Sequence, residues 1–244
     1  MNRSSGRPRA NEKVHARRPP ESSHANPSGP EASDHGSSPS ERNRSGERQF
    51  APSDTDRRGR VAAVFLDRDG VINENAFVND PNDLVLIPGA ADAIARLNRA
   101  SLPVVVVTNQ GGIAMGYLTE ETLGAIHDRL KQLLAVAGAF VDAIYYCPHI
   151  ANAQLPAYRV DCRCRKPGTG MLEEAREDLG IDLSKSVLVG DSTSDILAGI
   201  RAGCRTILVE TGFGGKDGKV SAVPDAMVSD LAAAVDLILR GRST

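Results

Sequence analysis

The chain has 244 residues, of which 41% are hydrophobic and 4% aromatic, and its formal net charge is −2 at pH 7. Residues 1–60 are rich in Ser, Pro, Arg, Asn and Gly and contain almost no large apolar side chains, so they cannot bury enough apolar surface to offset the entropy of ordering. We expect a disordered tail over residues 1–60 and a single folded domain over residues 61–240. The tail is net positive and the remainder net negative, which argues against a nucleic-acid-binding surface on the folded part.

No stretch reaches the ~18 consecutive apolar residues of a membrane span, and no apolar run follows the basic residues near the start as in a secretory signal. We therefore expect a soluble, cytoplasmic protein that acts as a monomer. A mildly basic tail could touch nucleic acid or an acidic membrane, but a solvated extension without a function is the simpler interpretation.

Short apolar runs alternate with longer helical patterns, which is typical of repeated βα units. The predicted strands are, in chain order, Val61–Leu66, Pro103–Thr108, Ala143–Tyr146, Ser186–Val189 and Arg205–Val209. The predicted helices are Gly89–Ala100, Thr119–Ala137, Thr169–Leu179, Ser194–Ala202 and Asp230–Leu239. This order predicts an α/β fold with three layers and a mainly parallel, Rossmann-like sheet. Such sheets bind ligands beyond the carboxyl ends of their strands.

The first strand ends in two carboxylates, Asp67 and Asp69, separated by Arg68 and followed by Gly70. Because strand side chains alternate, the two carboxylates should begin on one side while Arg68 points away. Neighbouring carboxylates repel each other unless a cation lies between them, and hard oxygen ligands suit Mg²⁺. The alternative is an ordinary polar turn, since Asp and Gly are common turn residues.

Further polar groups follow later strands. Thr108, Asn109, Gln110 and Gly111 offer a hydroxyl, two amides and flexible backbone after the second strand, groups that can hold phosphoryl oxygens. Asp191 follows the fourth strand, and Lys166 supplies a positive charge between the two. Taken separately, a plain loop and a surface lysine are the simpler interpretations of these residues.

Taken together, Asp67, Asp69, Thr108, Lys166 and Asp191 resemble, in their chain order, the four motifs of haloacid-dehalogenase (HAD) phosphatases. The resemblance implies that Asp67 is the nucleophile and Asp69 the general acid and base. It implies that Thr108 and Lys166 hold the transferring phosphoryl group. Asp191, the Asp67 carboxylate and the Asp69 main-chain carbonyl would form the Mg²⁺ site. The resemblance thus implies an aspartyl-phosphate intermediate.

Four other residues form a candidate structural zinc site: Cys147, His149, Cys162 and Cys164. Zinc prefers four tetrahedral Cys and His ligands, and a Cys3His set leaves no position open for catalysis. A disulfide is the alternative, disfavoured in a chain without an export signal. The fourth cysteine, Cys204, falls in a helical pattern, where we interpret it as a small buried residue.

The stretches FLDRDGVIN, VVVTNQGGIA, YYCPH and CRCRKP resemble the heptose-bisphosphate and histidinol-phosphate phosphatase branch of this family. The resemblance implies hydrolysis of the 7-phosphate of D-glycero-D-manno-heptose 1,7-bisphosphate, in nucleotide-activated heptose biosynthesis. Arg165 would then read the remote phosphate or other polar groups, and Asn109, Gln110 and Gly111 would line the pocket. This sequence departs from the pattern of that branch at two positions. Val71 stands where many of its members have Thr, and Ser192 stands where some have a basic residue.

Several alternatives remain open at this stage. Histidinol phosphate, a small phosphomonoester of histidine biosynthesis, is the second candidate substrate. The expected cap is small, comprising the zinc loop and residues 74–82, so a phosphatase of DNA ends is a remote alternative, as is a zinc-binding module without activity. We interpret Asp195 either as a group behind the metal ligands or as an N-terminal helix residue without a catalytic task.

Overall fold

The computed structural model describes residues 62–74 and 77–241. The predicted disordered tail over residues 1–60 lies outside the described residues, as does Val61, the predicted first residue of the first strand.

One parallel sheet of six strands organises the described chain, with the order β3-β2-β1-β4-β5-β6. The strands are β1 (Val64–Leu66), β2 (Val104–Asn109), β3 (Ala143–Cys147), β4 (Val187–Gly190), β5 (Arg205–Val209) and β6 (Ala226–Val228). In β1, Val64 pairs with Val104 of β2 on one side and with Val187 of β4 on the other. The strand order reverses direction between β1 and β4, so this sheet has its switch point there.

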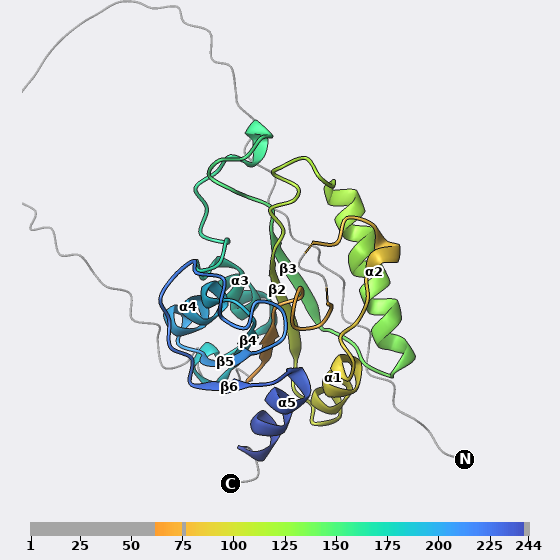
Figure 1. The fold of residues 1–244 in the computed structure, drawn as a ribbon. Coiled ribbons are helices and arrows are strands. Elements are labelled where there is room, and N and C mark those ends of the chain that lie inside the picture. The colour runs from red at the N-terminus through yellow and green to blue at the C-terminus, as the bar shows by residue number, and fades with distance from the viewer. Residues whose placement is uncertain (1–61, 75–76, 242–244) are drawn as a thin grey trace, which may run out of the picture.

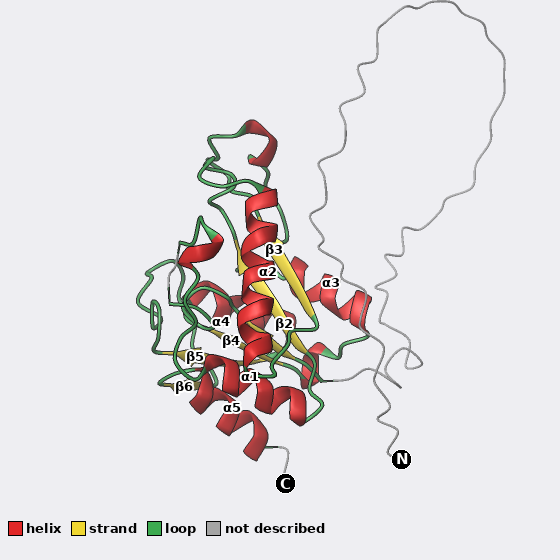
Figure 2. Cartoon of the chain, turned by 90° about the vertical axis from the view of Figure 1, so that its right-hand side faces the viewer, coloured by secondary structure: helices red, strands yellow, loops and turns green. Residues whose placement is uncertain are grey.

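Helices cover both faces of the sheet (Figures 1 and 2). They are α1 (Ala90–Arg99), α2 (Glu120–Val136), α3 (Gly170–Leu179), α4 (Thr193–Ala202) and α5 (Leu231–Arg240). One hydrophobic core joins α1, α2 and α5 to the face that carries Val64 and Leu66, and a second joins α3 and α4 to the face that carries Phe65. The predicted three-layer α/β architecture with a parallel sheet is therefore confirmed.

Local sequence explains where the helices begin and end. Thr119 and Asp230 accept main-chain hydrogen bonds at the starts of α2 and α5, and Gly180 and Gly203 end α3 and α4 in left-handed conformations that favour glycine. These signals place the predicted helix bounds within one residue of those observed.

In the C-terminal half, one strand was missed and the helical placement of Cys204 was wrong, although Cys204 is buried as expected. The strand β6 was not predicted, because it is a three-residue edge strand whose Met227 is 55% exposed, so it lacks the apolar run of a buried strand. Cys204 does not lie in a helix: it follows Gly203 and precedes β5, and it is buried against the α3–α4 face.

Two short 3₁₀ turns lie in the connections that follow β1 and β3. Pro81–Asp83 packs against α2, and Pro156–Tyr158 lies in the loop between β3 and α3, which projects beyond the sheet at the top of Figure 1. Among the helices of the described residues, none combines the length and apolar character needed to cross a membrane.

The core face of α2 provides a test of this packing. Leu130 is fully buried, so Leu130→Ala should lower the free energy of unfolding by about 2–5 kcal/mol through lost burial and a residual cavity. Val136, on the same helix, is 90% exposed, and Val136→Ala should change stability by less than about 0.5 kcal/mol. Urea denaturation of both variants measures the difference, and equal losses would contradict the assigned core.

Candidate active site

Carboxylates from two strands meet at the switch point of the sheet. Asp67 directly follows β1 and Asp191 directly follows β4, and both are buried. Carboxylate oxygens of Asp67, Asp191 and Asp195 lie within 4.8 Å of one another, an arrangement that could hold a metal ion. The pairing of β1 with β4 thus brings together residues that are more than a hundred positions apart in sequence.

Lys166 places a buried ammonium group among these carboxylates. Its Nζ lies 3.0 Å from Oδ1 of Asp67 and 2.5 Å from Oδ1 of Asp195, and it donates a 2.7 Å hydrogen bond to the carbonyl oxygen of Val107. Burial opposes the charged form of Lys166, but Asp195 and Asp67 outweigh it and hold the pKa of the ammonium above its ordinary value. Lys166 therefore carries a fixed positive charge.

Despite this lysine, the charged forms of Asp67 and Asp191 remain unfavourable in the metal-free structure. The pKa of Asp67 is raised to about 7, chiefly by burial and further by Asp195, Asp191 and Asp69, against the opposing effect of Lys166. The pKa of Asp191 is raised to about 6, again chiefly by burial. A divalent cation would favour the charged forms of both groups, so the donor set fits a hard metal ion.

Asp69 is held apart from this cluster. Arg68 donates to both oxygens of its carboxylate, at 2.7 Å and 2.9 Å from Nη2 and at 3.0 Å from Nε. The amides of Asn73 and Gln110 each donate a further hydrogen bond of 2.9 Å. The expectation that Arg68 points away from the carboxylates was wrong, because β1 ends at Leu66, strand alternation does not continue to Arg68, and its guanidinium folds back onto Asp69.

The amide side chains of Asn109, which ends β2, and of Gln110, which follows it, hold neighbouring groups in place. Nε2 of Gln110 lies 2.9 Å from the hydroxyl of Thr108 as well as from Asp69, so it joins these two side chains. Asn109 forms two hydrogen bonds with the main chain of Lys166, donating to its carbonyl at 3.1 Å and accepting from its N–H at 3.0 Å. Asn109 therefore fixes the segment that carries Lys166 rather than presenting a free amide.

A glycine-rich loop closes tightly over Asp191. Gly70 and Gly212 both have positive φ, and a Cβ on either would lie within 2.2 Å of Oδ2 of Asp191. The main-chain N–H of Phe213 donates a 2.8 Å hydrogen bond to that oxygen. The resemblance inferred from sequence pointed to Asp191 but carried no signal for this support, since it depends on a loop that follows β5.

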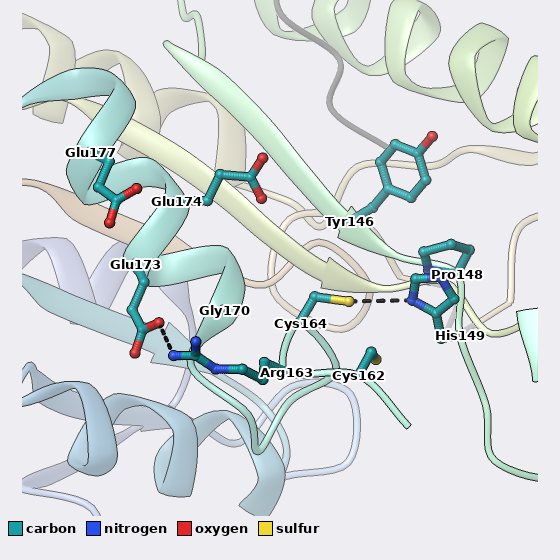
Figure 3. Close-up of a pocket in the computed structure, with 10 residues that line it drawn as sticks. All are labelled: Tyr146, Pro148, His149, Cys162, Arg163, Cys164, Gly170, Glu173, Glu174 and Glu177. Atoms are coloured by element: carbon teal, nitrogen blue, oxygen red, sulfur yellow. Dashed lines mark hydrogen bonds and ion pairs between the residues drawn. The ribbon is translucent and has the colours of Figure 1, made fainter. Parts of the chain in front are cut away.

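The four predicted zinc ligands lie close together, with Cys147 at the end of β3 and the other three in the loop that follows it. Figure 3 draws His149, Cys162 and Cys164 of this cluster. Sγ of Cys147 lies 3.5 Å from Sγ of Cys162 and 3.1 Å from Sγ of Cys164, and Nδ1 of His149 lies 3.4 Å from the latter sulfur. These sulfur separations exceed the ~2.05 Å of a disulfide, and all four cysteines of the chain are free.

Shared hydrogen bonds shift the titration of these thiols. The sulfurs of Cys147 and Cys164 share a hydrogen bond, which lowers the pKa of Cys164 to about 5 and raises that of Cys147 above its ordinary value. A cation that replaces these thiol protons would relieve the crowding, so three sulfurs and one imidazole fit a soft or borderline metal such as zinc.

Two contacts connect this loop to the rest of the structure. The carboxylate of Glu120, at the start of α2, accepts hydrogen bonds from the hydroxyls of Tyr146 at 3.1 Å and Tyr158 at 2.8 Å. Nη1 of Arg165 donates to the main-chain carbonyl of His149 at 3.1 Å and lies near Gly111, where a Cβ would be 3.3 Å from the same nitrogen. The structure thus brings Arg165 beside the segment after β2.

A cavity of about 400 Å³ lies beside the cysteine cluster, between the loop and α3 (Figure 3). Glu173, Glu174 and Glu177 lie along its wall, and Glu173 is ion-paired with Arg163 at 2.5 Å. Neither Asp67 nor Lys166 lines this cavity, so it is separate from the carboxylate cluster.

Asp195 combines the two roles left open by the sequence. Its Oδ2 accepts hydrogen bonds from the main-chain N–H of Ser192 at 3.1 Å and from the Ser192 hydroxyl at 2.6 Å at the start of α4. Its Oδ1 is the ion-pair partner of Lys166. It lies behind the other carboxylates and caps the helix at the same time.

Comparison with known proteins agrees with this arrangement. Residues 163–234 match the family model described as HAD-hydrolase-like. A D-glycero-D-manno-heptose-1,7-bisphosphate 7-phosphatase from Thermosynechococcus vestitus is 44% identical over 185 residues, covering 72% of this chain and 94% of the relative. The D-glycero-beta-D-manno-heptose-1,7-bisphosphate 7-phosphatase of Bordetella bronchiseptica is 40% identical, covering 72% and 97%.

Solved structures give the same result. The crystal structure of D,D-heptose 1,7-bisphosphate phosphatase from B. bronchiseptica, complexed with magnesium and phosphate, matches with a TM-score of 0.66 and 40% identity and covers 74% of this chain and 99% of that one. The fold, the order of the site residues along it and these relatives agree: the chain belongs to the HAD hydrolases, in the family of the D-glycero-D-manno-heptose-1,7-bisphosphate 7-phosphatases.

Proposed function

We propose that this protein is a Mg²⁺-dependent phosphatase that hydrolyses the 7-phosphate of D-glycero-D-manno-heptose 1,7-bisphosphate through an aspartyl-phosphate intermediate. The observation that carries the proposal is Asp67, buried at the switch point and 3.0 Å from the ammonium of Lys166. The substrate is suggested by the names of relatives 40–45% identical to this chain.

Asp67 is the proposed nucleophile. Its Oδ1 accepts a 2.7 Å hydrogen bond from the N–H of Arg68 and pairs with Lys166, so the carboxylate is oriented and Oδ2 is the oxygen left to attack. A bond forms between that oxygen and phosphorus as the bond to the sugar oxygen breaks. Lys166 reduces the repulsion between the anionic carboxylate and the phosphate dianion.

Asp69 is the proposed general acid and base. It would protonate the departing sugar oxygen and then take a proton from the water that attacks the aspartyl phosphate, so both steps use one carboxyl group. The hydroxyl of Thr108, linked to Asp69 through Gln110, would hold a phosphoryl oxygen beside it.

We propose that Asp67, Asp191 and the main-chain carbonyl of Asp69 hold Mg²⁺. The carboxylate of Asp69 is occupied by Arg68 and its neighbours, and Asp195 is paired with Lys166, so neither is as available as a ligand. When bound, the ion would supply positive charge that stabilises the transferring phosphoryl group.

We propose that the cysteine cluster holds a structural zinc ion. Its role would be to fix the segment from Cys147 to Cys164, which lies just before Arg165 and Lys166. This would place Arg165 against the part of the substrate that is remote from the reacting phosphate. Arg165 would read the second phosphate or the sugar hydroxyls, with Asn109, Gln110 and Gly111 along the adjacent edge. Because a sugar bisphosphate is too highly charged to cross a bilayer unaided, we place the reaction in the cytoplasm. We also propose that the enzyme acts as a monomer.

Replacing the nucleophile should separate activity from stability. Asp67→Asn should abolish phosphate release, by at least about a thousandfold, because an amide cannot form the acyl phosphate. The folded pKa of Asp67, about 7, lies above its ordinary value of 3.8, so ionised Asp67 destabilises the metal-free fold increasingly as the pH rises through this interval. At pH 8 without Mg²⁺, the melting temperature of the variant should equal or exceed that of the wild type.

The matched control for this experiment is Asp80→Asn, since Asp80 is exposed and caps a 3₁₀ turn, a task that Asn also performs. It should retain full activity. Undiminished phosphate release by Asp67→Asn would rule out the mechanism.

Metal content tests the cysteine cluster. Freshly purified reduced protein should contain about one equivalent of zinc, and Cys162→Ser should lose most of it and melt at a lower temperature, because the ion's binding energy contributes to folding. Inductively coupled plasma mass spectrometry measures the metal, with Cys204→Ser as the matched control. Less than about half an equivalent, together with a bond between Cys147 and Cys162, would favour a disulfide instead.

Substrate preference tests the function itself. With Mg²⁺ present, kcat/KM for D-glycero-D-manno-heptose 1,7-bisphosphate should exceed that for histidinol phosphate by at least about a hundredfold, or about 2.7 kcal/mol of transition-state discrimination. Phosphate release from both anomers of the bisphosphate, from histidinol phosphate and from a generic phosphomonoester gives the comparison. A preference for histidinol phosphate would overturn the substrate while retaining the catalytic roles.

A further inference from the structure

The connection between β3 and α3 carries both the cysteine cluster and Arg165. It runs from residue 148 to residue 169 and contains one short 3₁₀ turn, Pro156–Tyr158. A connection of this length needs side-chain contacts to hold it in one conformation, because each ordered residue loses conformational entropy. The position of those contacts decides which parts of the loop are fixed.

Glu120, the first residue of α2, binds this connection at two points. One carboxylate oxygen, Oε1, accepts a 2.8 Å hydrogen bond from the hydroxyl of Tyr158. The other oxygen, Oε2, accepts a 3.1 Å hydrogen bond from the hydroxyl of Tyr146. Tyr146 is buried in β3, and Tyr158 ends the 3₁₀ turn of the loop. A single carboxylate thus joins the end of a strand to a distant part of the loop that follows it.

Both phenols remain donors over the working range of pH. The pKa of Tyr158 is raised to about 12, chiefly by burial and further by the hydrogen bond to Glu120 and the charge of that carboxylate. Burial and Glu120 also raise the pKa of Tyr146 above its ordinary value. Hydrogen bonds to a carboxylate are roughly twice as strong as those between neutral groups, so this bridge can restrain a loop.

Tyr158 extends the restraint to the residues beside Arg165. Its main-chain carbonyl accepts a 3.2 Å hydrogen bond from the N–H of Ile150, and its ring centroid is 6.4 Å from that of His149. The carbonyl of His149 accepts the 3.1 Å hydrogen bond from Nη1 of Arg165. Gly111 lies against the same groups, since a Cβ there would be 2.5 Å from Cδ1 of Ile150 and 3.3 Å from Nη1 of Arg165. The guanidinium therefore lies against the segment that Tyr158 fixes.

We infer that Glu120 is a positioning residue for Arg165 and acts through Tyr158. The inference rests on the proposed function, and it assigns to Arg165 the phosphate that does not react. An arginine held in place before the substrate arrives loses less conformational freedom on binding, so it binds a phosphate more tightly. Removing the bridge should weaken recognition of the remote phosphate and leave the chemistry at Asp67 unchanged.

A merely structural role for Glu120 is the competing explanation, and the second phosphate of the substrate separates the two. D-glycero-D-manno-heptose 7-phosphate presents the same reacting group but has no remote phosphate. Loss of positioning should lower kcat/KM for the bisphosphate alone, whereas a folding defect lowers it for both substrates. Because the remote phosphate is bound alike in the ground state and the transition state, the change should appear in KM rather than in kcat.

The experiment compares Glu120→Ala with Glu121→Ala. Both carboxylates lie in the first turn of α2, and Glu121 is exposed, so the control removes a similar interaction with the helix dipole but no bridge. For Glu120→Ala, kcat/KM should fall about tenfold with the bisphosphate, mainly through KM, and less than about twofold with the monophosphate. Glu121→Ala should change neither value.

Two further variants keep the test independent of any folding defect in Glu120→Ala. Tyr158→Phe removes one hydroxyl and keeps the ring beside His149, and it should reproduce most of the loss on the bisphosphate. Arg165→Met should lower kcat/KM for the bisphosphate at least about tenfold, and adding Glu120→Ala should lower it less than about twofold more, because residues that act in series are not additive.

Equal losses on the two substrates, or losses of Glu120→Ala and Arg165→Met that multiply in the double variant, would overturn the inference. An unchanged KM for the bisphosphate in both Glu120→Ala and Tyr158→Phe would also overturn it. If Arg165→Met loses none of the preference for the bisphosphate, the proposed recognition of the second phosphate fails, and the inference fails with it. The effect of Arg165→Met therefore distinguishes the two failures.

Discussion

The arrangement of the site depends on one buried ammonium group. Burying the carboxylates of Asp67 and Asp195 together would be very costly without a cation, and Lys166 lies in contact with both. The chain supports this lysine from two directions, through the carbonyl of Val107 and through the paired hydrogen bonds of Asn109 to its main chain. The same charge that makes the cluster tolerable in the fold is the one that a phosphate dianion would meet.

The sheet positions the carboxylates, and the loop after β3 positions Lys166. Parallel pairing of β1 with β4 fixes the carboxylates, and the loop after β3 delivers Lys166. Cys164 lies two residues before Lys166, so whatever holds the cysteine cluster together also restrains the lysine. Glu120 adds a second restraint, since it ties Tyr146 and Tyr158 to the start of α2.

The sequence predicted the elements whose signals are local. Apolar runs located five of the strands, and the residues Thr119, Gly180 and Gly203 marked helix ends. The edge strand β6 was missed because its side chains bury little apolar surface, so its sequence has no apolar run. The side chain of Arg68 was misplaced because strand alternation applies only while the strand continues, and β1 ends at Leu66.

The candidate site was predictable only as a set of positions. Chain order brought Asp67, Thr108, Lys166 and Asp191 together, but it did not reveal that Asn109 binds the main chain of Lys166. Roles that depend on a partner distant in sequence require the tertiary structure.

The proposed catalytic groups and the proposed specificity group lie on separate parts of this fold. Ser192 is committed to Asp195 and Ser194 at the start of α4 and offers no positive charge to a substrate. The proposed recognition of a second phosphate is therefore assigned to Arg165, whose Nη1 donates to the carbonyl of His149. Because that carbonyl belongs to a residue of the cysteine cluster, the geometry of the cluster controls the position of the guanidinium. The sheet edge can thus keep its catalytic groups constant while changes in the loop alter which phosphomonoester is accepted.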